Sequence, residues 1–188
     1  MNSSYASHLN APIALSRKVS GILIPEGSPF ELEQGTEVSV TQNLGGSVTV
    51  NAGGMLIRIS PNDVDALGME PVDLPASRAE ARVDGSVDLS LVWEQMKTCY
   101  DPEIPINIVD LGLVYRCELE RRAEQNVVQV EMTLTAPGCG MGPFLVEDVR
   151  DKVSQVPNVD SVEVELVFDP PWSYDMMSEA ARLETGMF

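Results

Sequence analysis

Cys139 is the residue whose type and position best suit chemistry, because it lies in TLTAPGCGMGP, between a strand-like and a helix-like stretch. Pro143 fits the first turn of a helix, where a missing N–H costs nothing, so Cys139 lies close to a helix N-terminus. Amide hydrogens and the helix dipole there favour negative charge, and hence the thiolate, which is a nucleophile and a soft-metal ligand. Gly138, Gly140 and Gly142 let the backbone approach whatever the sulfur holds. The alternative is that Cys139 is a small residue filling a tight turn.

The rest of the chain argues against several kinds of site. A phosphate-binding loop would use the same geometry, but APGCGMGP lacks the GxxxxGK[ST] lysine. A cysteine hydrolase needs a histidine partner, and the single histidine, His8, lies in the N-terminal tail. A permanent zinc or iron–sulfur site needs about four ligands. The chain offers three scattered cysteines and no CxxC, so only a transient site, completed by a carboxylate, a second subunit or a client protein, stays open.

Cys99 and Cys117 are more simply explained by packing. Cys99 follows Met96 by three residues at the end of a predicted helix, and Cys117 shares an alternating strand face with Leu113 and Tyr115. A thiol redox enzyme would have to pair Cys139 with one of these two distant cysteines. We therefore treat a redox role as the weakest alternative.

The charge balance excludes some partners. The 188 residues include 12 basic and 29 acidic residues, a net charge of −17, which leaves no basic footprint for nucleic acid or an anionic membrane surface. The acidity agrees with solubility or with docking to a basic partner. No signal peptide, long apolar segment or paired-cysteine framework is visible, so we expect a reduced, cytoplasmic protein.

The sequence predicts an α+β fold with two domains. Residues 1–16 are small and polar and are expected to be disordered. Residues 17–70 alternate short apolar runs with glycine-rich turns, which predicts a small β-rich domain, a meander or barrel, followed by a helical turn that begins at Pro61. Residues 71–85 are the expected linker, with the domain boundary near residue 80.

Residues 86–170 predict an α-β-β-α-β domain. Ser86 or Asp88 could cap the first helix, whose apolar face would comprise Leu89, Val92, Trp93, Met96 and Tyr100. Alternating strands follow, with a second helix after the glycine-rich loop, so we expect a small mixed sheet with helices on one face. Residues 171–188 predict a C-terminal helix, beginning near Ser173, with one side formed by Met176, Ala180 and Leu183 beside Met177. This helix would either fold back on its own domain or form a partner surface or dimer interface.

Three stretches of this half carry a family resemblance. DPEIPINIVDLGLVY, TLTAPGCGMGP and FDPPW…MSEAA together resemble the PaaD-like metal–sulfur cluster biosynthesis domain of iron–sulfur assembly accessories. The stretch ILIPEGSPFELEQGTEVSVTQNLGGSVTVN is similar to the extra domain of the SufT branch of that family. The resemblance extends from about Arg17 over nearly the whole chain.

The resemblance implies a non-enzymatic accessory factor in iron–sulfur protein maturation, linked to the SUF pathway, with assembly proteins and client apoproteins as partners. It implies no permanent cofactor, but a transient cluster or iron held by the family's cysteine, Cys139. The site residues would be Cys139, Thr135, Pro137, Gly138, Gly140, Asp101, Glu103 and Asp110. For Asp101 a helix-ending turn, and for Asp110 a turn-stabilising bond, are structural alternatives.

Two further readings stay open. In one, the protein is an acidic adaptor that brings assembly machinery to clients, and Cys139 only packs. In the other, the site is shared across a homodimer. The sequence does not identify the clients or the role of the N-terminal domain.

Overall fold

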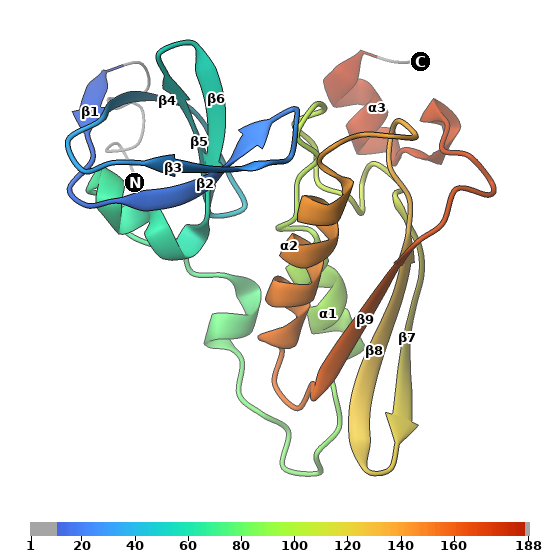
Figure 1. The fold of residues 1–188 in the computed structure, drawn as a ribbon. Helices are drawn as coiled ribbons and strands as arrows, with labels where there is room; N and C mark the ends of the chain where they lie inside the picture. Colours follow the sequence, from blue (N-terminus) through green and yellow to red (C-terminus); the bar gives the residue numbers. More distant parts are fainter. Residues whose placement is uncertain (1–10, 187–188) are drawn as a thin grey trace. The chain divides into compact units, whose positions relative to one another are not determined.

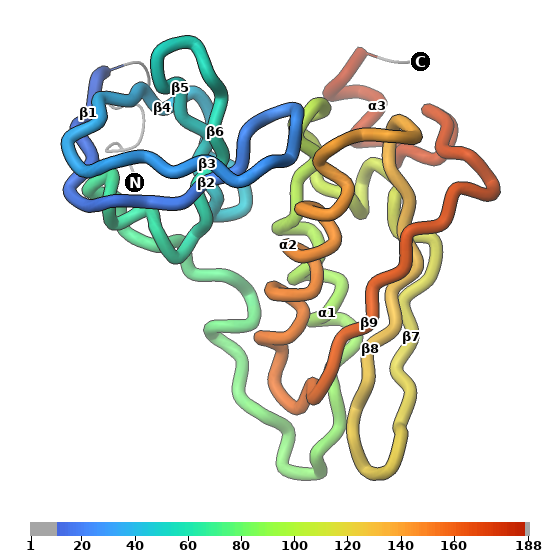
Figure 2. The backbone as a smooth tube through the Cα atoms, in the orientation of Figure 1, coloured from blue at the N-terminus to red at the C-terminus, as the bar shows by residue number. Residues whose placement is uncertain are grey.

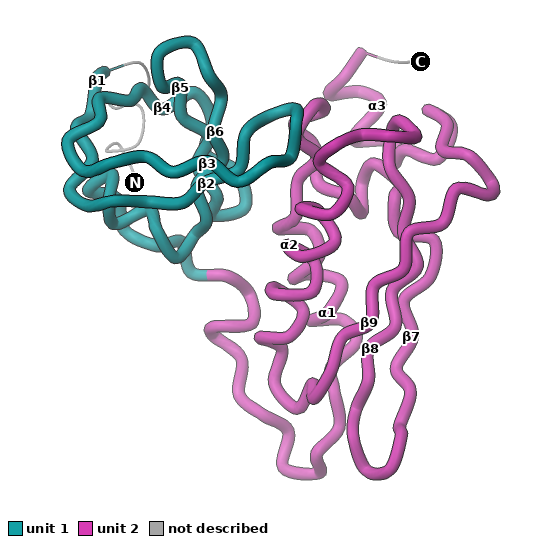
Figure 3. The backbone as a smooth tube through the Cα atoms, viewed as in Figure 1, with its two compact units in different colours: residues 1–73 teal, residues 74–188 magenta. Residues whose placement is uncertain are grey.

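The computed structural model describes residues 11–186, and the chain divides into two units, Met1–Asp73 and Leu74–Phe188 (Figure 3). The division differs from the boundary expected near residue 80, because most of the supposed linker, residues 71–85, belongs to unit 2. A short helix, η2 (Pro75–Arg78), buries Ala76 in the core of unit 2. The Ala76 N–H donates to Oε1 of the buried Gln95 at 3.0 Å.

Unit 1 is β-rich, as its alternating apolar runs predict. Six strands form one antiparallel sheet in the order β1-β4-β5-β6-β2-β3 (Figure 1). Their bounds are β1 (Pro12–Ala14), β2 (Val19–Ile24), β3 (Pro29–Leu32), β4 (Glu37–Leu44), β5 (Ser47–Ala52) and β6 (Met55–Ile59). Strands β4 to β6 form a meander, whereas β2 pairs with β6, so the sheet as a whole is not a simple meander.

The two ends of unit 1 are more ordered than the sequence indicated. Of the tail expected to be disordered, residues 1–10 lie outside the described part, but β1 occupies Pro12–Ala14 and Leu15 is buried in the core. Beyond β6, the turn expected at Pro61 is the 3₁₀ helix η1 (Pro61–Leu67). Ser60 caps it by accepting a hydrogen bond from the Asn62 N–H at 3.3 Å.

Unit 2 has the predicted α-β-β-α-β order. Its elements are α1 (Leu89–Met96), β7 (Val114–Arg122), β8 (Gln125–Met132), α2 (Gly142–Ser154) and β9 (Ser161–Leu166). Strand β8 is central, antiparallel to β7 and parallel to β9, so the small sheet is mixed, and both helices lie on one face of it (Figure 1). Asp88 caps α1 by accepting from the N–H groups of Ser90 and Leu91.

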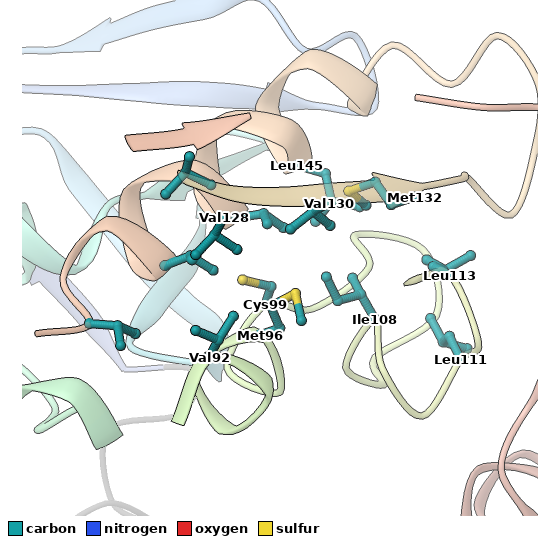
Figure 4. Close-up of a cluster of buried hydrophobic side chains, with 14 of the residues drawn as sticks. Val92, Met96, Cys99, Ile108, Leu111, Leu113, Val128, Val130, Met132 and Leu145 are labelled. Carbon is teal, nitrogen blue, oxygen red and sulfur yellow. The ribbon is translucent and has the colours of Figure 1, made fainter. Parts of the chain in front are cut away.

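The two faces of this sheet differ because β8 alternates. Val128, Val130 and Met132 point into the core under the helices, where they meet Val92 and Met96 of α1 (Figure 4). The other face carries charged side chains joined by exposed ion pairs, such as Arg116 with Glu131 and Arg122 with Glu163. Because one face of the sheet is buried and the other is exposed, apolar and polar residues alternate along its strands, and the strand prediction used this period-two pattern.

The predicted helix over residues 171–188 is wrong in its start and its buried face. A 3₁₀ turn, η3 (Tyr174–Met176), is followed by extended backbone at Met177, and α3 spans only Glu179–Thr185. Ser178 caps α3 and restarts the helical phase, so Met177 and Ala181 are buried, whereas Ala180 and Leu183 are exposed. The stripe expected through Met176, Ala180 and Leu183 does not exist.

Candidate functional site

The topology of unit 2 brings the three motif stretches to one end of the sheet. Strand β7 begins where β8 ends, because the two are antiparallel, and β9 ends there too, because it is parallel to β8. Residues 101–113 lead into β7, residues 133–141 leave β8, and residues 167–178 leave β9, so all three surround the same sheet end (Figure 2). We call this the cysteine end.

The cysteine loop, residues 133–141, makes two consecutive turns before α2. The Cys139 N–H donates to the Ala136 carbonyl at 3.3 Å, and the Gly142 N–H donates to the Cys139 carbonyl at 3.1 Å. Pro143 lies in the first turn of α2, as predicted, and the N-cap residue Met141 provides no side-chain cap. Cys139 is half-buried and packs against the core of unit 2.

Two glycines of this loop have different local causes. Gly138 has φ of +83°, which L side chains rarely adopt, and open space beside it. At Gly142 a Cβ would lie 2.8 Å from Cδ1 of Leu134, so a small residue is needed where α2 begins against the end of β8. Gly140 and Pro137 are exposed.

The other cysteines are less accessible than Cys139 or lie away from the cysteine loop. Cys99 is fully buried among core side chains (Figure 4). Cys117 is only half-buried, not a full core residue as expected, because it lies on an edge strand with a bulge between Val114 and Arg116. Burial, and secondarily the charge of Glu118, raise the pKa of Cys117 to about 11. None of the three cysteines, all of which lie in the described part of the chain, forms a disulfide bond.

Asp101 lies in the loop after α1 and is only 4% exposed. Its Oδ1 accepts hydrogen bonds from the N–H groups of Glu103 and Ile104 at 2.9 and 2.8 Å. Oδ2 lies 3.4 Å from the hydroxyl of Thr135, a long hydrogen bond that joins this loop to the cysteine loop. Burial raises the pKa of the Asp101 carboxyl, although the two amide donors oppose that shift.

The remaining predicted acids have different surroundings. Glu103 is exposed, and its backbone N–H is a donor to Asp101. Asp110 is half-buried in a turn: Nδ2 of Asn107 donates to its Oδ2 at 2.6 Å, and the Asp110 N–H donates back to Oδ1 of Asn107 at 2.9 Å. The structure therefore shows the turn-stabilising bond that was the structural alternative for Asp110.

The C-terminal segment closes over the Asp-Leu-Gly turn. Nε1 of Trp172 donates to the Leu111 carbonyl at 2.7 Å, and the Ser178 N–H donates to the Asp110 carbonyl at 2.8 Å. Gly112 has φ of +71°, and a Cβ there would lie 2.1 Å from the Met176 carbonyl oxygen. The FDPPW stretch contributes to the family resemblance, but the sequence assigns no role to Trp172. The signal for one is a tryptophan directly after two prolines.

These residues share one end of the sheet without forming a metal centre by themselves. Within residues 11–186, no three His, Cys, Asp or Glu side chains are grouped so that they could hold a metal ion. The structure brings Asp101 to Thr135, and it leaves Glu103 and Asp110 on separate turns of the same loop. Cys139 is the one predicted soft-metal ligand at this end.

No helix in the described part of the chain is long and apolar enough to cross a membrane.

Comparisons with known proteins converge on unit 2. The family described as iron–sulfur cluster assembly protein matches residues 90–166. The chain is 50% identical over 95 residues to an Fe-S protein maturation auxiliary factor of Porphyromonas gingivalis, covering 50% of this chain and 88% of that protein. It is 41% identical over 87 residues to the auxiliary factor SufT of Staphylococcus aureus, covering 46% of this chain and 96% of that protein. A solved DUF59 domain from Bacillus anthracis aligns at 37% identity with a TM-score of 0.47, covering 53% of this chain and 92% of that one.

The family match lies wholly within unit 2. The chain belongs to the iron–sulfur cluster assembly protein family. The family match includes none of unit 1, so the likeness of unit 1 to the extra SufT domain stays a prediction.

Proposed function

We propose that the protein is a non-enzymatic accessory factor in iron–sulfur protein maturation. Cys139 holds a cluster or iron transiently and passes it on. Support comes from membership of the family and from the names of two relatives, which are both called Fe-S protein maturation auxiliary factors. The cargo is an iron–sulfur cluster or iron, and it is a substrate, not a resident cofactor.

The position of Cys139 is the observation that carries this proposal. The thiol is partly accessible, on a glycine-rich loop directly before α2, whereas Cys99 is fully buried and Cys117 lies on a strand. One thiolate supplies one ligand, so a cluster with about four ligand positions would be shared with a second subunit, an assembly protein or the client. That incomplete ligand set suits transfer.

Replacing Cys139 with Ser tests the proposal in cells where the variant is the only copy of the chain. We expect iron–sulfur enzyme activities to fall to the level of cells lacking the protein. Cys117→Ser is the matched control, because Cys117 is also half-buried and free. Full client activity with Cys139→Ser would contradict a ligand or transfer role.

A direct measurement complements this test. The wild-type protein and Cys139→Ser are purified anaerobically, incubated with ferrous iron and sulfide, desalted, and analysed for bound iron and acid-labile sulfide. We expect both elements to be retained by the wild type and lost from Cys139→Ser. Equal retention by the two proteins would count against Cys139 as the ligand.

A purely adaptor function is the second candidate, and the exposed C-terminal side chains favour it. Tyr174 is 53% and Leu183 61% exposed, on a chain with a net charge of −17. Truncation after Pro171 would not test it cleanly, because Met177 and Ala181 are buried in the core. Tyr174→Ala combined with Leu183→Ala tests it while leaving Met177 and Ala181 in the core. A loss of client maturation larger than that of Cys139→Ser would favour the adaptor.

The proposal includes a cytoplasmic location and no catalytic turnover of its own. Three cysteines that form no disulfide bond within residues 11–186 agree with a reducing compartment. The expected partners are iron–sulfur assembly proteins and client apoproteins, and a homodimer that shares the cluster is one arrangement that would complete the ligand set. Analytical ultracentrifugation with and without bound iron would detect such a dimer.

A further inference from the structure

Asp101 is an unusual carboxylate for a group expected to hold iron. It is 4% exposed, and both of its oxygens have donors: two backbone N–H groups on Oδ1 and the hydroxyl of Thr135 near Oδ2. An aspartate that accepts from the amides two and three residues ahead stabilises its own turn. A buried carboxylate with these bonds is not available to an ion arriving from solvent unless the loop unpacks.

The Thr135 contact matters because the cysteine loop, although Leu134 and Met141 are buried, has few other hydrogen bonds to the rest of unit 2. At one side of the loop, the Thr133 N–H donates to the Leu113 carbonyl at 2.8 Å. At the other side, Gly142 packs against Leu134 where α2 begins. Between them, in the part of the chain that the structure describes, residues 134–141 make a single side-chain hydrogen bond, from Thr135 to Asp101.

We infer that Asp101 is a positioning residue: through the hydroxyl of Thr135 it holds the cysteine loop in the conformation that keeps the Cys139 thiol half-buried against the core. The two turns from Ala136 to Gly142 transmit this restraint over the three residues that separate Thr135 from Cys139. The inference rests on the proposed function, because the restraint matters there as the control of a transfer thiol. It differs from the ligand role that the family resemblance implied for Asp101.

The structure predicts how the accessibility of the Cys139 thiol changes when this restraint is removed. Cys139 packs against the core of unit 2, so releasing its loop exposes the sulfur to solvent. A small reagent then reaches the thiol more often, while transfer of a cluster, which needs a defined geometry, becomes less efficient. A group that instead bound the cargo directly would not change the reactivity of the cargo-free thiol in this way.

The test measures alkylation of Cys139 by iodoacetamide in the full-length, cargo-free, reduced protein. Peptide mass mapping separates Cys139 from Cys99 and Cys117. We expect Thr135→Val to raise the alkylation rate threefold or more, and Thr135→Ser, which keeps the hydroxyl, to stay within twofold of wild type. Thr98→Val is the matched control, because the Thr98 hydroxyl donates to the Gln95 carbonyl, away from the cysteine loop, and its rate should also stay within twofold.

Asp101→Asn completes a double-mutant cycle. If Asp101 acts through Thr135, the rate for Asp101→Asn with Thr135→Val should equal that for Thr135→Val alone. Near-ultraviolet circular dichroism identifies any variant that fails to fold, and the threonine variants keep the test decisive in that case. A rate for Thr135→Val within twofold of wild type, or multiplicative effects in the double variant, would overturn the inference. The alkylation rates are measured without a client protein. They therefore test the positioning role of Asp101 separately from the cellular experiment with Cys139→Ser, which tests the proposed function.

Discussion

The two ends of the sheet β7-β8-β9 are built differently. At the end opposite the cysteine end, which we call the asparagine end, Asn126 donates from Nδ2 to the carbonyls of Gly85 and Asn158, both at 2.9 Å. Its N–H donates to Oδ2 of Asp160 at 2.8 Å, and Asn158 donates to the carbonyl of Ser86 at 2.9 Å. At the cysteine end, residues 134–141 have one long side-chain hydrogen bond among the described contacts.

This difference separates structure from chemistry within one small domain. The asparagine end joins the segment before α1 to the sheet through Asn126 and Asn158, and it carries no cysteine. The cysteine end carries the thiol and the acids. Side-chain hydrogen bonds hold its first loop, residues 101–113, whereas in the described part of the chain residues 134–141 have only the long bond from Thr135 to Asp101. Stability should therefore depend on both ends, whereas the behaviour of Cys139 should depend on only one.

Gly112→Ala should have the largest effect on stability. The new Cβ would meet the Met176 carbonyl at 2.1 Å, and φ of +71° adds backbone strain, so we expect a loss of about 3 kcal/mol in the free energy of unfolding. Because the C-terminal segment must shift, Cys139 alkylation should also change. Gly138→Ala is the control: it has a similar φ of +83° but no nearby atoms, and should cost about 1 kcal/mol. Equal losses in urea denaturation would show that the contact with Met176 is unimportant.

Asn126→Ala should come next, with a loss of about 2 kcal/mol, because two carbonyls at the asparagine end lose their donor. Alkylation of Cys139 should stay at the wild-type rate. Gln129→Ala, which removes a solvent-exposed hydrogen bond to Glu163, should change stability by less than about 0.5 kcal/mol. A changed alkylation rate of Cys139 in Asn126→Ala would contradict the claim that the reactivity of this thiol depends only on the cysteine end.

The sequence predicted this organisation unevenly. Period-two and helical spacing gave the α-β-β-α-β order, and Pro143 correctly marked the start of α2. The bulge after Val114 and the phase break at Ser178 were missed, because each shifts the register by local backbone geometry that apolar spacing does not encode. The sequence MSEAARLETG did contain the cap signals, a serine before and a glycine after the short helix.

The site was predictable as a set of motifs, but not as a set of contacts. That Asp101 would lie beside Thr135 follows from the antiparallel β7–β8 pairing, which the sequence did not specify. The carboxylate was therefore interpreted as a ligand candidate, although its burial and its amide donors indicate a positioning role. Hydrophobic alternation and composition do not predict which residues distant in sequence form hydrogen bonds with each other.

The pH dependence of stability tests whether burial or the amide donors have the larger effect on the pKa of the Asp101 carboxyl. The pKa of this carboxyl is raised by burial, so the folded state keeps its proton where the unfolded chain, with a pKa near 3.8, has lost it. The folded state then binds more protons, and stability falls as pH rises from about 3.8 through the folded pKa. We expect the unfolding free energy of wild type minus that of Asp101→Asn to decrease over this range, by at most about 1.36 kcal/mol per pH unit.

Asp84→Asn gives a control of opposite sign. The hydrogen bonds from Ser86 lower the pKa of the exposed Asp84, so its contribution is present above pH 3.8 and is lost as pH falls through the folded pKa. Urea denaturation of the three proteins between about pH 3 and about pH 7 tests both signs. A wild-type minus Asp101→Asn difference that rises with pH would mean that the amide donors outweigh burial.

The smallest effect on stability is expected at the exposed side chains of the cysteine end. Leu183→Ala should change the unfolding free energy by about 0.5 kcal/mol or less, because its side chain is 61% exposed. Tyr174→Ala should cost about 1 kcal/mol, because it also removes an edge-to-face contact with Trp172, at 5.0 Å between ring centroids. A loss of client maturation in Leu183→Ala would therefore report a contact with a partner, not unfolding. If maturation is unchanged while Cys139→Ser abolishes it, the function of the cysteine end lies in the thiol loop, and the C-terminal segment serves to hold the Asp-Leu-Gly turn in place. If maturation falls in these variants while Cys139→Ser is fully active, the same end of the sheet is a docking surface, and the lightly tethered loop has another explanation.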